Sequence, residues 1–588
     1  MKRYTYRMKT FQIQIFGTIL IAVFVLLPVF AAAQFADGSG TEEEPWQIAT
    51  VGQLQNVGQQ EHLSGHFILI ADIDASETAN WNEGDGFEPI GGYDNESSST
   101  PFNGSFDGNG FTINNLTIDR SDESYIGFFG VVDNGSIRNV RLEQINITGD
   151  DNVGGLIGYR EGGLVIGSCT SGIVTGNNLV GGLIGGSFGD VHSSCSYADV
   201  SGNEYVGGLI GMHMEASVEE SYASGHVTGQ KFVGGLAGMS GVMLHASYAT
   251  GDVAGTSRVG GLVGGNNGAL SDAEKCIVSQ SYSTGTVTGE EETGGFAGWN
   301  PWEITSSYWN TETSGKPAAV GSDPEVTPDV INEVKGLGTD QMTGQNAYIH
   351  MYQFDFNQTW QLTEGYPVLA WQDPENAVDR PEVPIIRVDT TMRDFGLVST
   401  DRTDTVEVSV RNTGNNVLSG EVFLGGPDAG RFAIAGELSG FTLEAGSSQA
   451  VAVTFQPGSL ESYQAELNIV HDAPNRSDSL IIPLSGEGKE PTFVSPDPDR
   501  PRKVQLHQNY PNPFNPATQI RFALPEQVNV TLTVYNLIGQ QVATLVHGTR
   551  SPGWHDVTFD ASGLSSGVFI YQIKVEDYVE TRQMMFVK

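Results

Sequence analysis

Apolar and glycine residues recur together in the middle third of the chain at a nearly fixed spacing. After IGFFG at 126–130, a phrase of the form Val-Gly-Gly-Leu-x-Gly returns six times, ending with the variant TGGFAG at 293–298. Five of the six intervals are 26 or 27 residues long and the last is 34. A period of about 20–50 residues is typical of stacked repeats that bury their apolar sides against one another. The pattern therefore predicts a protein that presents a long surface.

A second phrase lies between the glycine phrases, as in SCTSGIVTG at 168–176, SYASGHVTG at 221–229 and SYSTGTVTG at 281–289. Each repeat thus carries at least two short strands that end at glycine. At about 3.3 Å per extended residue, one repeat traces a perimeter near 90 Å, which suits a coil with three short faces. The repeats show no helical period, no leucine-rich spacing, and are shorter than propeller blades. They predict a parallel β-solenoid, preceded at 34–125 by an N-terminal cap and the first coils.

The glycine phrase has a structural explanation. Its valine and leucine cannot both face inward in an uninterrupted strand, because facing alternates along a strand. Two intervening glycines allow a corner, since glycine adopts conformations that a Cβ forbids. The repeated tyrosines at 197, 222, 248 and 282 are expected to form a buried ladder, with an aromatic strip for sugar stacking as the alternative.

Three cysteines occur, all within the repeats: Cys169, Cys195 and Cys276. Aligning Ser168-Cys169 with Ser196-Tyr197 places Cys195 two residues out of register with Cys169. The separation is then about 8 Å, which exceeds the reach of a disulfide. We therefore expect the cysteines to be small core residues, in a fold that disulfides do not hold together.

The two ends of the chain differ from the repeats. A basic head, an apolar run at 15–30 and three alanines predict a signal peptide over 1–33, cleaved between Ala33 and Gln34. After the solenoid and its C-terminal cap (126–372) and a polar linker (373–384), residues 385–488 are predicted to form seven short strands of an antiparallel immunoglobulin-like sandwich. A proline-rich linker at 489–503 precedes a last domain at 504–588.

The net charge is −41, from 29 basic and 70 acidic residues. A nucleic-acid partner is excluded, because phosphate binding requires a basic patch. Solubility explains the acidic excess, and scattered calcium sites are an open alternative. Asp107-Gly108-Asn109-Gly110 lacks the later glutamate of an EF-hand loop and is interpreted as a turn. No cofactor is predicted.

The sequence of residues 37–372 resembles the GLUG-repeat family. The resemblance includes Phe106-Asp107-Gly108-Asn109-Gly110 before the repeats and Ser306-Ser307-Tyr308-Trp309 after them. The resemblance implies a secreted or surface β-helix, either adhesin-like or the front part of an IgA-cleaving metalloprotease. The protease requires His-Glu-x-x-His. The chain has only Glu61-His62-Leu63-Ser64-Gly65-His66, so no peptidase is expected. Asn412-Thr413-Gly414 and Phe455-Gln456-Pro457 resemble Hydin-type immunoglobulin-like modules.

The last domain resembles the type A C-terminal sorting domain of the type IX secretion system, a small immunoglobulin-like β-sandwich. The resemblance implies export by the outer-membrane machinery, in some members followed by attachment to surface lipopolysaccharide. The expected fold class is thus all-β, a right-handed parallel β-solenoid (β-helix) followed by two immunoglobulin-like β-sandwich domains. The motif residues that carry the resemblance are Tyr510, Pro511, Asn512, Pro513, Tyr535, Asn536, Gly539, Gly567 and Lys588.

These features predict an adhesin-like protein at the surface of a Gram-negative bacterium, binding an unidentified glycan or protein partner. A ligand-free coat protein is one alternative. A glycoside hydrolase or polysaccharide lyase is another, because carboxylates about 5–10 Å apart can hydrolyse glycosides. Acidic runs exist at Asp150-Asp151, Glu219-Glu220 and Glu290-Glu291-Glu292, but they adjoin glycine-rich turns where solvated acids are expected. The prediction is that the chain is not an enzyme.

Overall fold

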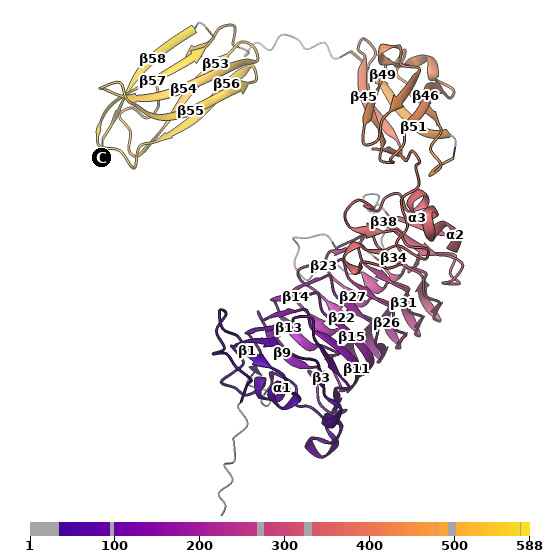
Figure 1. The fold of residues 1–588 in the computed structure, drawn as a ribbon. Coiled ribbons are helices and arrows are strands. Elements are labelled where there is room, and N and C mark those ends of the chain that lie inside the picture. The colour runs from indigo at the N-terminus through magenta and orange to yellow at the C-terminus, as the bar shows by residue number, and fades with distance from the viewer. Residues whose placement is uncertain are drawn as a thin grey trace, which may run out of the picture.

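The computed structural model describes residues 34–93, 99–266, 276–300, 302–322, 332–477, 479–491, 501–576 and 578–587. The predicted leader with Ala33, and the terminal Lys588, lie outside the described residues. Within them the chain forms a parallel β-solenoid of about eight turns, followed by two β-sandwiches (Figure 1). The all-β solenoid predicted from the repeats is confirmed.

One coil illustrates the winding. It runs through β21 (Glu204–Gly207), β22 (Ile210–His213), β23 (Val218–Glu219), β24 (Tyr222–Ala223) and β25 (Val227–Thr228). Each of these strands pairs in parallel with its counterpart in the next coil, so equivalent positions stack, in several cases with the same residue, as in Val206 on Val233 and Tyr222 on Tyr248. The coil crosses three sheets, of 6, 8 and 24 strands, and this matches the expected three faces.

The other strands of the solenoid repeat this plan. The six-stranded sheet also contains β12 (Val153–Gly154), β16 (Asn178–Gly181), β26 (Lys231–Gly234), β31 (Ser257–Gly260) and β36 (Glu291–Gly294). The eight-stranded sheet also contains β9 (Phe129–Asp133), β13 (Ile157–Glu161), β17 (Ile184–Ser187), β27 (Ala237–Ser240), β32 (Val263–Asn266), β37 (Ala297–Trp299) and β39 (Val320–Ser322). The 24-stranded sheet begins in the N-terminal cap with β1 (Trp46–Ile48), β2 (His66–Leu69), β3 (Ile73–Asp74), β6 (Ser105–Asp107), β7 (Thr112–Asn114) and β8 (Thr117–Asp119). Its strands within the repeats also include β10 (Ser136–Arg138), β11 (Arg141–Thr148), β14 (Leu164–Ile166), β15 (Cys169–Thr175), β18 (Asp190–His192), β19 (Cys195–Ser196), β20 (Asp199–Ser201), β28 (Leu244–His245), β29 (Tyr248–Ala249), β30 (Val253–Ala254), β33 (Ile277–Ser279), β34 (Tyr282–Ser283) and β35 (Val287–Thr288). Its last strands are β38 (Glu303–Asn310) and β40 (Asn332–Leu337).

The glycine phrase forms a corner between two sheets. β21 ends at Gly207 in the six-stranded sheet, and β22 begins at Ile210 in the eight-stranded sheet. A Cβ on Gly207 would lie 2.0 Å from the carbonyl oxygen of Ile210, and one on Gly208 would lie 2.2 Å from that of Gly235. Val206 and Leu209 are both fully buried, so the corner turns both side chains into the core. The predicted role of the glycines is confirmed.

Serine hydroxyls join successive coils inside the solenoid. The Oγ of Ser194 accepts a hydrogen bond from the backbone N–H of Ser168 and donates one to the carbonyl of His192. The same arrangement continues through four further coils, and the N–H to Oγ distances between coils are 3.1–3.3 Å. These hydroxyls satisfy backbone groups that would otherwise be buried without partners. The remaining members are Ser221, Ser247, Ser281 and Ser307.

A column of buried polar side chains follows the eight-stranded sheet. Arg160, Ser187, His213 and Ser240 occupy equivalent positions in successive coils and are 0–1% exposed. The Nε of Arg160 donates to Ser187 Oγ at 2.9 Å, while its Nη1 atom and both imidazole nitrogens of His213 make no hydrogen bond of good geometry. Burial lowers the pKa of Arg160 to about 9. Among the described residues of the solenoid, buried side-chain nitrogens without a hydrogen-bond partner are concentrated in this column.

The structure corrects the interpretation of the cysteines. Cys169 and Cys195 lie directly opposite each other on β15 and β19, with Cα atoms 4.5 Å apart, and form a disulfide. The expected two-residue offset was wrong because Ser168 aligns with Ser194 and not with Ser196. Cys276 is a buried free thiol, as expected. One disulfide thus links two coils of a fold that the sheets hold together.

Short helices, which the sequence did not predict, lie at both ends of the solenoid. α1 (Val51–Val57) buries Val51, Leu54 and Val57 at the first coils. α2 (Thr339–Met342) and α3 (Gly344–His350) lie in the C-terminal cap. The minor elements are η1 (Ser76–Asn80), η2 (Asn82–Gly84), β4 (Gly92–Tyr93), β5 (Ser99–Thr100), β41 (Trp360–Gln361), β42 (Val368–Leu369) and η4 (Ala370–Gln372).

The immunoglobulin-like module is a sandwich of a four-stranded and a five-stranded sheet. It has nine strands where seven were expected, and β44 pairs with β51 in parallel, so the module is not wholly antiparallel. Its elements are β43 (Ile386–Val388), β44 (Arg393–Ser399), β45 (Asp404–Asn412), β46 (Leu418–Gly425), η5 (Ala429–Arg431), β47 (Phe432–Ile434), η6 (Ala435–Glu437), β48 (Gly440–Leu443), β49 (Ser448–Phe455), β50 (Ser462–His471) and β51 (Ser479–Lys489).

The last domain is a second sandwich, of a three-stranded and a four-stranded sheet whose strands all pair antiparallel; a single parallel bridge joins Phe514 to Phe586. Its core contains Tyr571, Phe522 and Ile573, all fully buried. Its strands are β52 (Gln505–Leu506), β53 (Ala517–Leu524), β54 (Val528–Asn536), β55 (Gln541–Arg550), β56 (Gly553–Asp560), β57 (Gly567–Val575) and β58 (Tyr578–Phe586).

Candidate functional site

The tyrosines of the second phrase form a stacked ladder along the large sheet. Tyr222, Tyr248 and Tyr282 lie with ring centroids 4.8 and 4.9 Å apart and planes within 2° of parallel. Tyr308 continues the register in the next coil, and the disulfide of Cys195 occupies the equivalent position before Tyr222. All four rings are 0–5% exposed. The expected buried ladder is confirmed for Tyr222, Tyr248 and Tyr282, and Tyr308 extends it by one coil.

The C-terminal cap covers most of this ladder. The hydroxyl of Tyr282 donates to the carbonyl of Pro367 at 2.7 Å, and that of Tyr248 donates to Gln372 at 3.1 Å. Trp360 packs 5.6 Å from the ring of Tyr282. Burial raises the pKa of the Tyr248 and Tyr282 hydroxyls well above their ordinary value. These phenols are therefore neutral structural groups, and the sugar-stacking alternative fails for them.

Tyr197 does not belong to the ladder and is open to solvent. Its position corresponds to Ser224 of the next coil, because Ser196 pairs with Ala223. The ring is 51% exposed, and its hydroxyl is hydrogen-bonded to that of Tyr222. Trp371, 37% exposed, lies 5.8 Å from Tyr222, and its indole N–H donates to the carbonyl of Glu220 at 2.9 Å. Two exposed aromatic rings thus flank the place where the cap ends.

A cleft of about 400 Å³ opens at this place. Its floor comes from β11, β15 and β19 of three successive coils, with the disulfide at the surface of the floor. Arg141 and Glu143 supply a charged donor and a charged acceptor, and Thr170 and Ser171 supply hydroxyls. Such a combination of apolar rings with a few polar groups is typical of small-ligand sites. The full lining is Arg141, Leu142, Glu143, Cys169, Thr170, Ser171, Cys195, Tyr197, Tyr222, Trp371 and Gln372.

The acidic runs that the sequence offered as hydrolase candidates do not line this cleft. Asp151 accepts hydrogen bonds from the backbone and side chain of Asn178, and Glu292 pairs with Arg258 at 2.6 Å. Glu219 lies 3.9 Å from His192. Each acid therefore makes local contacts on its own face of the solenoid.

The turn at 107–110 is held by its own side chains. Asp107 accepts hydrogen bonds from the backbone N–H of Asn109 at 2.8 Å and from the side chain of Asn139 at 3.1 Å. These contacts agree with the interpretation of the segment as a turn. Among the described residues, no three His, Cys, Asp or Glu side chains gather as a metal site.

The sorting-domain motifs, far apart in sequence, meet at one end of the last sandwich. Asn512 Oδ1 accepts the backbone N–H of Met585 at 2.8 Å, and Phe514 exchanges backbone hydrogen bonds with Met585 and Val587. Asn536 pairs with Phe569 across β54 and β57, and Gly567 pairs with Phe586 at the same end. Tyr535 precedes Asn536, whose Oδ1 accepts the N–H of Gln540 and so closes the turn that contains Gly539 (φ +80°). Tyr510 is 82% exposed beside Pro511, and Pro513 completes the loop.

Apolar side chains are exposed at the same end. Leu537 and Ile538 lie in the turn after β54 and are 66% and 79% exposed. Met585 and Val587, beside the chain terminus, are 45% and 47% exposed. Exposed apolar groups around a shared edge are typical of a protein-interaction surface.

Models of known protein families match three separate parts of the chain. Residues 508–588 match the family described as "Secretion system C-terminal sorting domain", residues 202–228 match "The GLUG motif", and residues 383–489 match "Cep192 domain 4". The chain carries a type IX secretion C-terminal sorting domain. This domain implies interaction with the type IX export machinery and points to secretion and display at the cell surface.

Two curated relatives match part of the chain. Halomucin of Haloquadratum walsbyi is 43% identical over 152 residues, which is 25% of this chain and 2% of halomucin. A putative Gly-rich membrane protein of Evansella cellulosilytica is 40% identical over 115 residues, 19% of this chain and 13% of that protein. A PapD-like domain of human CEP192 aligns with 19% of this chain at 17% identity, over 92% of its own length, with a TM-score of 0.16. The chain thus spans a small part of both curated relatives.

No helix within the described ranges has the length and apolar character needed to cross a membrane. The sequence did not predict that Trp371, Arg141 and Glu143 line the cleft. Trp371 reaches the cleft through a contact with Glu220, 151 positions away in sequence, and no local pattern indicates such a contact.

Proposed function

We propose that the chain is a surface-displayed binding protein that takes a glycan in the cleft between Tyr197 and Trp371. The observation that carries this proposal is the pair of exposed rings over a floor of hydroxyl and charged groups. Sugar rings have apolar faces that pack on aromatic rings, and hydroxyls that pair with arginine and carboxylate groups. The proposal includes cleavage of the leader between Ala33 and Gln34 and export to the outer surface of a Gram-negative bacterium, so that the cleft faces the outside of the cell.

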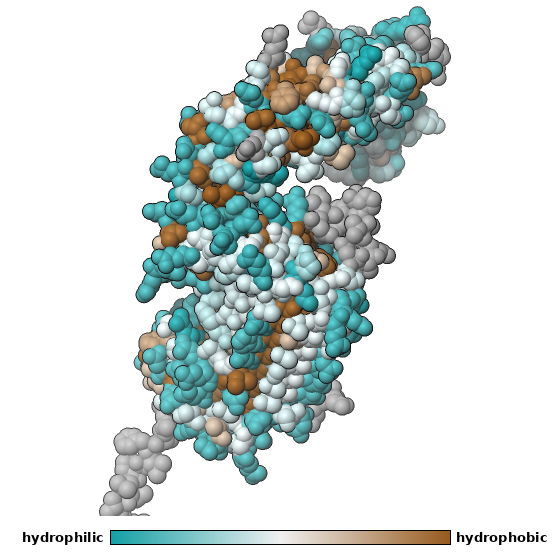
Figure 2. All heavy atoms as spheres, turned by 90° about the vertical axis from the view of Figure 1, so that its right-hand side faces the viewer, coloured by the Kyte–Doolittle hydropathy of each residue, from teal (hydrophilic) through white to brown (hydrophobic). Residues whose placement is uncertain are grey.

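The solenoid surface favours this cleft over a broad apolar contact. Figure 2 shows one face of the solenoid as mostly hydrophilic and neutral residues, with a single narrow hydrophobic stripe along it. A protein partner held by hydrophobic burial needs a wider apolar patch. The cleft, with its mixed lining, suits a polar ligand better than this face does.

Binding without hydrolysis is part of the proposal. Glycoside hydrolysis requires two carboxyl groups on either side of the bond, and Glu143 is the one acid in the described lining. Arg141 beside it gives the cleft a balanced charge, which suits a neutral or weakly charged sugar.

The test measures binding of the mature chain, residues 34–588, to a glycan array, followed by titration with the best oligosaccharide. Tyr197→Ala is expected to raise the Kd at least tenfold, which corresponds to about 1.4 kcal/mol. The reason is that the ligand loses the ring on which it stacks. Within the fold, the substitution removes the hydroxyl contact and the edge-to-face ring contact of the half-exposed Tyr197 with Tyr222.

Trp554→Ala is the matched control, because Trp554 is 39% exposed in the sorting domain, away from the cleft. It should leave the Kd unchanged. Equal binding by the Tyr197 variant and the unaltered chain would reject the cleft as the site. Release of shorter oligosaccharides would favour an enzyme, and no binding to any glycan would favour a coat protein.

A further inference from the structure

Basic side chains gather where the solenoid cap meets the immunoglobulin-like module. Lys335 Nζ lies 6.0 Å from the ring centroid of Tyr352, and the Cζ atoms of Arg387 and Arg476 lie 5.9 and 5.4 Å from it. A side-chain nitrogen of Arg387 also donates to the backbone carbonyl of Tyr352. Such a cluster is unexpected in a chain with a net charge of −41.

The cluster contains a repulsive pair. Arg387 on β43 lies directly opposite Arg411 on β45 in the antiparallel ladder. Like charges at directly opposite positions destabilise a sheet. Burial, together with the charge of Arg411, lowers the pKa of Arg387, and burial and the charge of Arg476 lower that of Lys335. The folded protein thus holds several positive charges together at a cost in stability.

The described residues supply no carboxylate ion pair for any of these cations. The buried Nε atoms of Arg387 and Arg476 have no hydrogen-bond partner. Asp355 lies near Arg387 and partly offsets its charge, but a carboxylate oxygen of Asp355 accepts the backbone N–H of Asn357 at 2.9 Å. Glu333 accepts from Gln353 at 3.0 Å. The positive charge exceeds the nearby negative charge.

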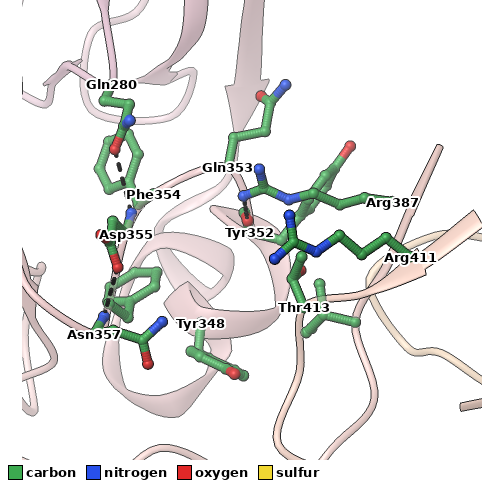
Figure 3. A pocket seen from close by; sticks show the side chains of 12 residues that line it. Gln280, Tyr348, Tyr352, Gln353, Phe354, Asp355, Asn357, Arg387, Arg411 and Thr413 are labelled. Carbon is green, nitrogen blue, oxygen red and sulfur yellow. Dashed lines mark hydrogen bonds between the residues drawn. The ribbon is translucent and has the colours of Figure 1, made fainter. Parts of the chain in front are cut away.

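A pocket of about 260 Å³ lies against this cluster. Arg387 and Arg411 reach into it from the module, and Tyr352, Gln353 and Asp355 line it from the cap (Figure 3). Because one water in the liquid takes about 30 Å³, the pocket has room for a small polyatomic ion with bound water. Its lining comes from both domains, so an ion in it would contact both.

We propose that this pocket is a binding site for a tetrahedral oxyanion, phosphate or sulfate, which bridges Arg387 and Arg411 and fastens the module to the solenoid cap. Planar guanidinium groups match the geometry of such oxygens and donate two hydrogen bonds each. The anion offsets the repulsion between the two arginines and accepts hydrogen bonds from the guanidinium groups that line the pocket. It is either a free ion or an ester group on a polysaccharide.

The test uses the chain 34–588 and isothermal titration calorimetry with sodium phosphate and sodium sulfate, against sodium chloride at equal ionic strength. Saturable binding of the oxyanions and not of chloride is expected. Arg411→Gln should raise the Kd at least tenfold, because it removes one of the two bridging groups. Arg411 is exposed, so the substitution leaves no cavity in the core, and it relieves the repulsion with Arg387. Arg402→Gln, an exposed arginine in the same module, changes the net charge equally and should have no effect.

A second readout follows the joint itself. Amide hydrogen exchange over 344–357 and 383–388 should slow in phosphate for the unaltered chain and not for Arg411→Gln. A sulfated disaccharide that binds at least tenfold more tightly than sulfate would assign the site to an ester group, and equal affinities would assign it to the free ion. Oxyanion binding no stronger than chloride binding, or an equal loss in Arg402→Gln, would overturn the proposal.

Discussion

Gly207→Ala is expected to lower the free energy of unfolding of the solenoid by more than about 4 kcal/mol, placing it among the most damaging single substitutions. The new Cβ would lie 2.0 Å from the carbonyl oxygen of Ile210 and 2.7 Å from the backbone nitrogen of Gly238. Both atoms are backbone, so no rotamer change relieves the overlap. The neighbouring coil must move away, and its parallel pairing with β21 and β22 is then lost. Urea unfolding followed by circular dichroism measures the change.

Gly52→Ala is the matched control for this substitution. Gly52 lies in α1, and a Cβ there meets no atom within 4 Å. Alanine is favoured over glycine in a helix by up to about 1 kcal/mol, so this variant should be as stable as the unaltered chain or slightly more stable. If Gly207→Ala unfolds at the same urea concentration as Gly52→Ala, the corner does not depend on glycine.

The solenoid is also expected to lose stability in acid because of His213. Burial, and secondarily the charge of Arg160, lower the pKa of this imidazole to about 3, with the backbone at Ala216 and Asp190 opposing in part. Its ordinary value in an unfolded chain is about 6.5. Above pH 6.5 both states are neutral and stability is constant. Between pH 6.5 and 3 the unfolded chain binds a proton that the folded chain excludes, so stability falls by up to about 1.4 kcal/mol per pH unit.

Substitution isolates this contribution. His213→Leu removes the titrating group. The free energy of unfolding of this variant should therefore fall by roughly 4 to 5 kcal/mol less between pH 6.5 and pH 3 than that of the unaltered chain. At pH 7 the variant should be close to neutral, because the imidazole nitrogens make no hydrogen bond of good geometry. His226→Leu, which removes a histidine with 67% exposure of its side chain, should leave the acid slope in place. Parallel slopes for the His213 variant and the unaltered chain would contradict the assignment.

The period of the glycine phrase was sufficient to predict the solenoid. Residues at equivalent positions, such as Val206 and Val233, stack in register because the parallel ladder repeats once per coil. The cysteines were placed wrongly because the alignment used the dipeptide Ser-Tyr. The nine-residue phrases at 168–176 and 194–202 both begin with Ser-Cys and end with Val-x-Gly, and aligning them gives the observed pairing of Cys169 with Cys195.

The sites depend on contacts that no repeat encodes. The cap brings Trp371 to Glu220, and the β43–β45 ladder sets Arg387 against Arg411. Each contact joins segments whose sequences carry no shared pattern. The sorting motifs were recognised from their residues, but their meeting at one end of the sandwich follows from strand register alone.

The serine hydroxyls that connect the coils interact with backbone groups and therefore tolerate changes in the surrounding side chains. A gene that gained or lost one whole repeat would leave these connections intact at the new boundary. Each added repeat would lengthen the rod by about 4.8 Å, the spacing of neighbouring strands. Evolution can thus adjust how far the protein extends from the cell in small, uniform steps without redesigning either end.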